Sequence, residues 1–234
     1  MSFIHLHTHS HYSLLDGLGQ IPDLVRAAKK DNATALALTD HGVMYGALAF
    51  YKACKKEGIK PIIGVEAYMA QHGLANKNSA QDRERRHITL LAKNNIGYQN
   101  LLKLTTIAHL EGFYYKPRID WETLLRHKEG VIVLSGCLNG EIATYLRTHE
   151  VEDAVVLVEK YLREFGEDFY LEAWRHTHLP EAMRISEKLT ELAKHTGVPL
   201  VATQDAHYLR PEDNEAQDVL VCIQTKKKKI TTKF

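Results

Sequence analysis

The sequence predicts an α/β fold in which short strands alternate with longer helices. Seven short runs are rich in apolar, β-favouring residues, and the stretches between them carry apolar residues at helical spacing. The composition is that of an ordinary globular protein, with 44% hydrophobic and 25% charged residues in a chain of 234. A chain of this length fits one large domain with a sizeable core.

The elements follow one another in a regular order. The expected strands cover residues 3–7, 35–39, 61–69, 87–92, 131–135, 168–173 and 199–204. Helical spacing predicts helices that include 21–31, 45–58, 97–110 and 179–197. Because strands and helices alternate, we expect parallel strands joined by right-handed connections. Both a closed barrel and an open doubly wound sheet fit this pattern.

Two stretches interrupt the alternation. Residues 71–86, "QHGLANKNSAQDRERR", are polar and charged, and we expect a mobile surface insertion there. Residues 226–234, "KKKKITTKF", form a basic tail without a capping element. We expect this tail to mark the point at which a longer chain continues.

Charge and cysteine content exclude several classes of protein. The net charge of +1 provides no overall attraction to nucleic acid or membranes, so any anion must be bound by local patches or metals. Three cysteines without a CxxC pair argue against a disulfide framework and against a zinc ribbon. No apolar run reaches membrane-spanning length, and no signal sequence opens the chain. We therefore expect a cytoplasmic protein with no membrane contact.

Metal-binding residue types cluster where the predicted strands end. Ligands bind at the carboxyl ends of strands in parallel α/β folds. Strand alternation places His7 and His9 of "HLHTHSH" on one face. Buried ionisable groups in such number are costly unless they are paired or bind metal. The candidate ligands are His7, His9, Asp16, His41, Glu66, His87, Cys137, Asp205 and His207.

So many candidates indicate more than one ion. A single cation takes four to six ligands, so this set suits two or three divalent ions. Imidazole, carboxylate and one thiolate favour Zn²⁺, Fe²⁺ or Mn²⁺ over Mg²⁺ or Ca²⁺. Sites with several metal ions are suited to displacement at phosphorus.

Long motifs resemble one family, the PHP (polymerase and histidinol phosphatase) domains, in the form found in bacterial DNA polymerase III alpha subunits. The resemblance spans residues 3 to about 225 and implies a PHP domain over 1–225, folded as a distorted (β/α)7 TIM-like barrel. The matching strings are "HLHTHSHYSLLDG", "ALTDHGVMYGALAFYKACKKEGIKPIIGVEAY", "HITLLAKNNIGYQNLLKL", "GFYYKPRID", "LSGCLNGEI" and "PLVATQDAHYL…CIQT".

The resemblance also implies roles for individual residues. All nine candidate ligands match metal positions of the family, and Glu66, Asp205 and His207 take catalytic roles. The implied groups are His7, His9, Glu66 and Asp205 for a first ion, Glu66, His87 and Cys137 for a second, and Asp16, His41 and His207 for a third.

Four further histidines stay outside this set. We expect His5 to pack or to support the ligands, and His11 to lie beyond them. The segment "EAWRHTHLPE" departs from the family pattern, so His176 and His178 receive no role.

The expected function is metal-dependent phosphodiester hydrolysis, as a 3′→5′ proofreading exonuclease of a replicative DNA polymerase. The expected partners are a DNA 3′ end and polymerase domains of the same longer chain. One alternative is a small-molecule phosphoesterase resembling histidinol phosphatase. A second is a metal-stabilised structural or docking module without turnover, since metals can also be retained for folding.

The segment "GFYYKPRID" is the candidate contact for a DNA strand end. Aromatic rings beside basic groups can stack on bases and meet phosphates. The candidates are Tyr114, Tyr115, Lys116 and Arg118. The alternative is that these aromatic residues cover the barrel flank or a neighbouring domain.

Overall fold

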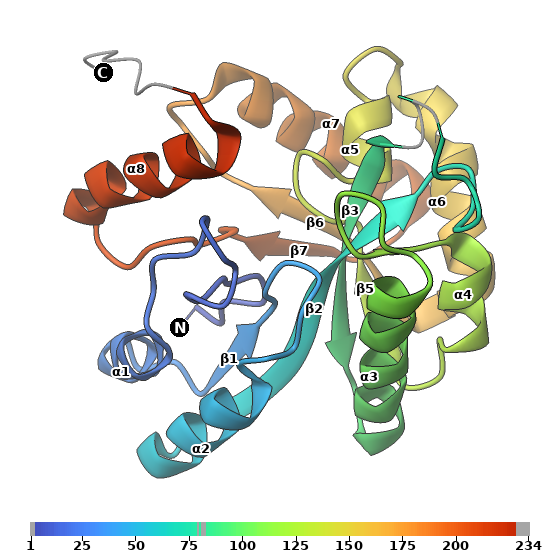
Figure 1. Ribbon diagram of the computed structural model, residues 1–234. Helices are drawn as coiled ribbons and strands as arrows, with labels where there is room; N and C mark the ends of the chain where they lie inside the picture. The colour runs from blue at the N-terminus through green and yellow to red at the C-terminus, as the bar shows by residue number, and fades with distance from the viewer. Residues whose placement is uncertain (1–2, 79, 81–82, 228–234) are drawn as a thin grey trace.

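The computed structural model describes residues 3–78, 80 and 83–227 and shows a curved sheet surrounded by helices (Figure 1). The strands follow the order β1-β2-β3-β5-β6-β7, and β4 pairs with β2. This arrangement confirms the predicted α/β fold and is consistent with a distorted TIM-like barrel. The strands are β1 (Ala35–Leu38), β2 (Lys60–Ala70), β3 (Arg85–Ala92), β4 (Arg118–Ile119), β5 (Val131–Leu134), β6 (Phe169–Trp174) and β7 (Leu200–Thr203).

The helices lie on the outer side of the sheet (Figure 1). The described helices are α1 (Ile21–Lys30), α2 (Ala47–Glu57), α3 (Asn95–Leu110), α4 (Trp121–Arg126), α5 (Glu141–Tyr145), α6 (Val151–Phe165), α7 (Pro180–Thr196) and α8 (Asn214–Thr225), with short 3₁₀ turns at Gly166–Asp168 and Pro211–Asp213. Local signals explain several ends. The Asn94 side chain accepts the Gly97 N–H at 3.0 Å and starts α3, whereas α7 begins with Pro180 and ends at Gly197. In the described part of the chain, no helix combines the length and apolar character needed to cross a membrane.

The prediction of a first strand over residues 3–7 is wrong. Bends at Leu6 and His7 interrupt the ladder, so this segment is irregular. It nevertheless lies between β1 and β7: the Ala37 N–H donates to the His5 carbonyl at 2.9 Å, and the His9 N–H donates to the Ala206 carbonyl at 2.8 Å. The N-terminal segment therefore joins the two edges of the curved sheet.

The expectation of uniformly parallel strands also needs correction. β3 runs antiparallel to both of its neighbours, β2 and β5, because the chain reverses direction between the end of β2 at Ala70 and the start of β3 at Arg85. The first residues of β3 therefore lie at the same edge of the sheet as the carboxyl ends of the parallel strands. We call this edge the rim. The short strand β4 has no counterpart among the predicted elements.

The return loop between β2 and β3 is anchored to its surroundings at two points. The Leu74 N–H donates to the Asp120 carboxylate at 3.1 Å, and the Arg118 guanidinium donates to the Asn76 carbonyl at 3.1 Å. Residues 79, 81 and 82 of the loop lie outside the described residues, as does 228–234 of the expected basic tail. Mobility of the insertion remains a prediction.

Apolar packing holds the sheet on both sides and inside its curve. The largest buried cluster joins the sheet to α3, α4, α5, α6 and α7, and a second joins β1 to α1 and α2. A third, small cluster contains Ala37, Leu91 and Leu134 from β1, β3 and β5. Leu91 shares a face of β3 with Thr89, which contacts His7 at 3.3 Å. This cluster therefore forms an apolar floor under the polar rim.

Candidate metal centre

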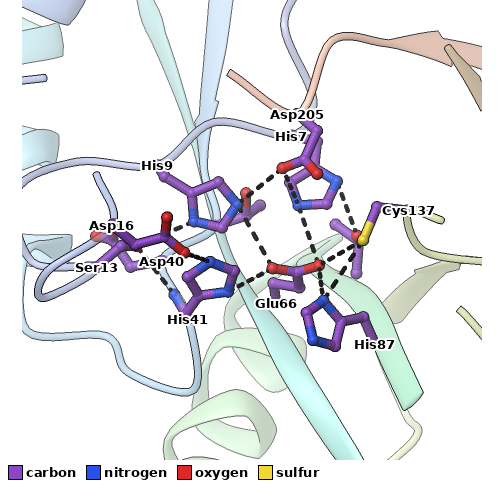
Figure 2. A network of polar contacts seen from close by, with 12 residues as sticks. His7, His9, Ser13, Asp16, Asp40, His41, Glu66, His87, Cys137 and Asp205 are labelled. Carbon is purple, nitrogen blue, oxygen red and sulfur yellow. Dashed lines mark hydrogen bonds and ion pairs between the residues drawn. The ribbon is translucent and has the colours of Figure 1, made fainter. Parts of the chain in front are cut away.

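Glu66 is the hub of the polar cluster at the rim (Figure 2). Its side chain is fully buried on β2. Its Oε2 lies 2.6 Å from Nδ1 of His41, and its Oε1 lies 2.7 Å from Nδ1 of His87. The Cys137 Sγ lies 3.3 Å from the same Oε1. The structure brings together all nine predicted residues, which we call the Glu66 centre: His7, His9, Asp16, His41, Glu66, His87, Cys137, Asp205 and His207.

Backbone geometry places the Glu66 neighbours. His41 follows β1 and forms a parallel bridge with Glu66. His87 stands opposite Tyr68 in the β2–β3 register, one step outward from Glu66. Cys137 follows Gly136, which has φ +84° and lies so close to the His87 carbonyl that a Cβ would stand 2.5 Å from its oxygen. Only glycine allows this turn to bring the thiol against His87.

His7 and His9 present the same ring nitrogen to the centre. The His7 Nδ1 lies 2.6 Å from the Glu172 carboxylate, to which it donates. The His9 Nδ1 lies 3.0 Å from the Ser13 hydroxyl, and that hydroxyl donates to Asp40 at 2.7 Å. These partners hold a proton on Nδ1, so Nε2 is the atom of each ring that faces the centre and would bind a metal.

The outer part of the centre contains His41, Asp16 and His207. The His41 Nε2 lies 2.8 Å from Asp16, and the His207 Nε2 lies 3.4 Å from the His41 Nε2. The His207 Nδ1 donates to the Asp205 carbonyl at 2.8 Å, so its Nε2 also faces inward. Asp205 adopts φ +47°, an uncommon conformation that aspartate tolerates better than most residues.

The arrangement of atoms fits divalent cations. Among the described residues, the buried Nε2 of His7 makes no hydrogen bond, while Nδ1 of His41 and Oε2 of Glu66, which stand 2.6 Å apart, have no hydrogen bond to any other group. Such atoms are costly unless something binds them. Three groups offer ligand atoms that lie within 4.8 Å of one another: His7–His9–Glu66, His41–Glu66–His87 and His9–His41–His207. The clusters indicate metal binding, and Figure 2 shows their side chains converging on Glu66.

Electrostatics keep the hub carboxylate ionised. Burial alone would raise the pKa of Glu66, but the neighbouring imidazoles, His87 and His41 first, hold it well below its ordinary value. Burial disfavours the charged form of His41, yet the carboxylates of Glu66 and Asp16 raise its pKa to about 10. Without a cation, these carboxylates therefore keep a proton on His41, and a metal that binds its ring must displace that proton.

Burial lowers the pKa of His9 and raises the pKa of Cys137. Burial, together with the charges of His41 and His207, lowers the pKa of His9 to about 3, so its ring is neutral and able to bind a metal. Burial and the carboxylates of Glu66 and Asp205 raise the pKa of the Cys137 thiol well above its ordinary value. Because a metal binds the thiolate, a cation at Cys137 must displace this proton.

Sequence reasoning missed the residues that support the candidate ligands. Glu172 on β6 is fully buried, accepts from Thr203 at 2.7 Å and binds His7. Gln217 on α8 donates to Asp16 at 3.2 Å. An acidic residue inside the apolar run "FYLEAW" was a usable signal for Glu172. Gln217 carried no local signal, because its contact depends on how α8 returns to the rim.

The other histidines lie outside the Glu66 centre. The His5 ring packs edge-on against Phe3, with centroids 4.8 Å apart, and the His11 ring packs against Tyr12 at 4.4 Å. His176 and His178 belong to the loop between β6 and α7, and His178 is exposed. None of the four belongs to a potential metal-binding group among the described residues.

The candidate DNA-contacting residues occupy different environments. Tyr115 is exposed with the Arg83 guanidinium 4.5 Å above its ring, and Lys116 is half-buried with its ammonium 5.7 Å from the Tyr68 ring. Arg118 is buried and donates to the Gly112 carbonyl at 3.0 Å as well as to Asn76. Its guanidinium also lies 5.2 Å from the Tyr114 ring. Arg118 therefore joins the loops beside the rim, whereas Tyr115 and Lys116 remain reachable.

A curved α/β sheet with a buried histidine–carboxylate cluster at its rim defines a barrel-like protein built to bind metals. Comparison with known families gives the particular class. The chain belongs to the PHP domain family, whose model matches residues 5–176.

The curated relatives are much longer than this chain. DNA polymerase III subunit alpha of Borreliella burgdorferi is 49% identical over 97% of this chain and 20% of that protein. The subunits of Treponema pallidum and Aquifex aeolicus are 47% and 45% identical over 97% and 96% of this chain, again with 20% of each protein covered. The chain thus spans about a fifth of the length of these relatives.

Solved structures with low sequence identity share the fold. A protein described as a metal-dependent phosphoesterase from Bifidobacterium adolescentis matches with a TM-score of 0.57 at 14% identity, covering 89% of both chains. A protein described as an amidohydrolase from Chromobacterium violaceum matches with a TM-score of 0.54 at 15% identity, covering 93% of this chain and 96% of that one. These matches support the barrel-like architecture.

Proposed function

We propose that this chain is a metal-dependent phosphoesterase that acts as a 3′→5′ exonuclease on a DNA primer end. The observation that carries the proposal is the Glu66 centre, in which nine metal-competent side chains meet and the buried Nε2 of His7 has no hydrogen bond. The description of the Bifidobacterium neighbour and the identity of the polymerase relatives support the same chemistry and the choice of DNA.

The nine residues of the centre would hold two or three divalent ions, of zinc, manganese or iron. The distances support the three groups implied by family resemblance: Asp205 lies 3.1 Å from His9, Cys137 lies 3.4 Å from His87, and Asp16 lies 2.8 Å from His41. Such ions lower the pKa of bound water and neutralise charge on a phosphate. Imidazole, carboxylate and thiolate are the ligands these metals prefer.

The chain's own residues position the reacting groups. Glu66 holds the inner and outer parts of the centre together, since His7, His41 and His87 all approach it. Asp205 and His207 have side chains that are 21% and 19% exposed, so they stand on the side of the centre that a substrate can reach. Because Nδ1 of His207 donates to the Asp205 carbonyl, Nε2 is the ring atom that can bind a metal ion or accept a proton.

Proofreading also requires that a strand end be held beside the centre. Tyr115, with its exposed ring, and Lys116 are the reachable members of "GFYYKPRID". A base can stack on the ring while a phosphate meets the ammonium. In a longer chain, polymerase domains would supply this strand end from their primer.

The test uses a 3′-mismatched, 5′-labelled primer–template with added Mn²⁺ or Zn²⁺. We expect stepwise shortening from the 3′ end that disappears in EDTA and in a His207→Ala variant. The matched control is His178→Ala, because His178 is exposed and outside the centre. Shortening that persists in His207→Ala would contradict the proposed site. Hydrolysis of a phosphomonoester with no shortening of DNA would indicate a small-molecule phosphoesterase. If neither reaction occurred, the result would indicate a structural module.

A further inference from the structure

Two cations lie against one aromatic ring at the edge of the Glu66 centre. The Arg85 guanidinium carbon is 5.6 Å and the Lys116 ammonium 5.7 Å from the centroid of the Tyr68 ring. Neither cation has a carboxylate at ion-pair distance among the described residues, although Arg85 donates to the Arg83 carbonyl at 2.9 Å. Two cations that face one ring, with no carboxylate at ion-pair distance among the described residues, form a place where an anion is favoured.

Strand register fixes Arg85 relative to the metal ligands. In the β2–β3 pair, Glu66 stands opposite Thr89, Tyr68 opposite His87, and Ala70 opposite Arg85. Alternate residues of a strand share a face, so the row on β3 leads outward from Thr89 through His87 to Arg85. Each two-residue step covers about 6.6 Å. Arg85 therefore stands one step farther from Glu66 than the ligand His87.

The loop before β4 places Lys116 on the same side. Tyr115 adopts φ +61°, which turns the chain, and Pro117 packs on Gly42, the residue after His41. A Cβ on Gly42 would stand 2.7 Å from Pro117 and 3.2 Å from Tyr68, so this contact requires glycine. The packing of Pro117 on Gly42 therefore holds the loop that carries Lys116 next to the residue that follows His41.

Tyr68 connects the cations to the centre. Its ring packs edge-on against His87, with centroids 5.1 Å apart, and stacks toward His41 at 6.0 Å. The same ring thus contacts two histidines of the metal centre and lies within 6 Å of both cations. An anion held by Arg85 and Lys116 would stand next to, and not inside, the Glu66 centre.

We propose that Arg85 and Lys116 jointly bind the phosphate adjacent to the one that is hydrolysed. The inference rests on the proposed function, since it assumes that a phosphate occupies the Glu66 centre. It deepens that function because the second phosphate selects a polynucleotide over a phosphomonoester. Arg85 and Lys116 are specificity-determining residues, and the residues of the Glu66 centre carry out hydrolysis.

The test measures binding without turnover. We would titrate a 5′-fluorescein-labelled ten-nucleotide single strand into the protein in EDTA and follow fluorescence anisotropy. We expect Arg85→Gln and Lys116→Gln each to weaken binding about tenfold, as for loss of one charge-assisted contact. Because both cations bind one phosphate, the double variant should reduce the slope of log affinity against log salt by about 0.7. The matched control is Lys194→Gln, on the exposed side of α7.

A second titration separates the two phosphates. Inorganic phosphate, added to the Mn²⁺-loaded protein, should bind the variants as well as it binds the unaltered chain. Oligonucleotide binding that is unchanged in both variants would overturn the inference, as would an equal loss of inorganic phosphate binding. The proposed function can be rejected independently of this inference. If the variants bind the single strand more weakly but the unaltered chain shows no hydrolysis, the phosphate contact is supported and the exonuclease is rejected.

Discussion

At the scale of single residues, Glu172 shows how a side chain outside the ligand set can control it. Its carboxylate receives Nδ1–H of His7 and the hydroxyls of Thr203 and Thr89. This leaves Nε2 of His7 buried, without a hydrogen bond and directed at Glu66 and Asp205. Outer partners of this kind orient metal-binding histidines and increase their basicity.

The first prediction concerns Glu172→Gln. A glutamine amide has one acceptor oxygen and one NH₂ group, so it cannot accept from all three donors that surround the carboxylate. We expect metal affinity to fall about 10–100-fold. Isothermal titration calorimetry with Mn²⁺ or Zn²⁺ measures this affinity. The matched control is Glu191→Gln, because Glu191 is exposed on the outer side of α7. Equal affinities for the two variants would reject a role for Glu172 in orienting His7.

The second prediction uses a thiol outside the centre. Cys54 is fully buried in α2, and burial raises its pKa to about 12. Its thiolate fraction at pH 8 is therefore about 10⁻⁴ and rises only as the pH approaches that pKa. We expect iodoacetamide at pH 8 to alkylate the half-buried Cys222 and leave Cys54 unmodified in the folded protein. Mass spectrometry of the peptides reads this out, and rapid modification of Cys54 would contradict its burial.

At the scale of elements, α8 is unusual because it has no buried residue yet reaches the centre. Its Gln217 donates to Asp16, while Val219 and Ile223 are 51% and 57% exposed. The helix therefore adds little to the core but holds Asp16, a candidate ligand in the outer part of the centre. β3 illustrates the same dependence of the site on whole elements, because only its antiparallel direction brings the beginning of a strand, and His87, to the rim.

The third prediction separates these roles of α8. Gln217→Ala removes the hydrogen bond to Asp16 but no buried packing, so we expect hydrolysis to fall severalfold while the free energy of unfolding changes by less than about 0.5 kcal/mol. Activity and urea unfolding measured together test this. Gln224→Ala on the same helix is the matched control. A loss of stability that parallels the loss of activity would show that Gln217 acts on folding.

At the scale of the whole molecule, the Glu66 centre joins segments from both ends of the chain. The N-terminal segment pairs with β1 and with residues after β7, so His7, His9 and Asp205 meet only when the sheet curves closed. Cations that bind this assembly bind the folded state alone, and they therefore stabilise it.

The fourth prediction is that metal removal lowers the melting temperature. At a metal concentration 100 times the Kd, binding adds about 2.7 kcal/mol. For a domain of this size that corresponds to roughly 5–10 °C. Differential scanning fluorimetry after EDTA treatment and after reloading with Mn²⁺ or Zn²⁺ measures the shift. Glu66→Gln should show a much smaller shift, and an equal shift in that variant would place the stabilising ion elsewhere.

Much of the fold could be predicted from local patterns. Six of the seven expected strands are present, since apolar runs such as 61–69 and 131–135 reflect burial that any packing of the sheet requires. The prediction of a strand over residues 3–7 was wrong because the alternating histidines satisfy the strand pattern, whereas bends at Leu6 and His7 break the ladder. The predicted direction of β3 was wrong because the alternation of strands and helices does not indicate whether a polar loop between two strands reverses the chain.

The sequence by itself determined which chemical groups are available: histidine, carboxylate and thiol at or near the ends of the predicted strands. The tertiary structure alone decided how they are used. It assigned Glu66 to the hub, placed Glu172 and Gln217 behind the candidate ligands His7 and Asp16, buried Arg118, brought His87 to the rim, and set Arg85 and Lys116 against the ring of Tyr68. The physical reason is that residue type sets which ligand atoms exist, whereas distance and burial, which depend on register and chain closure, set their partners and their charge.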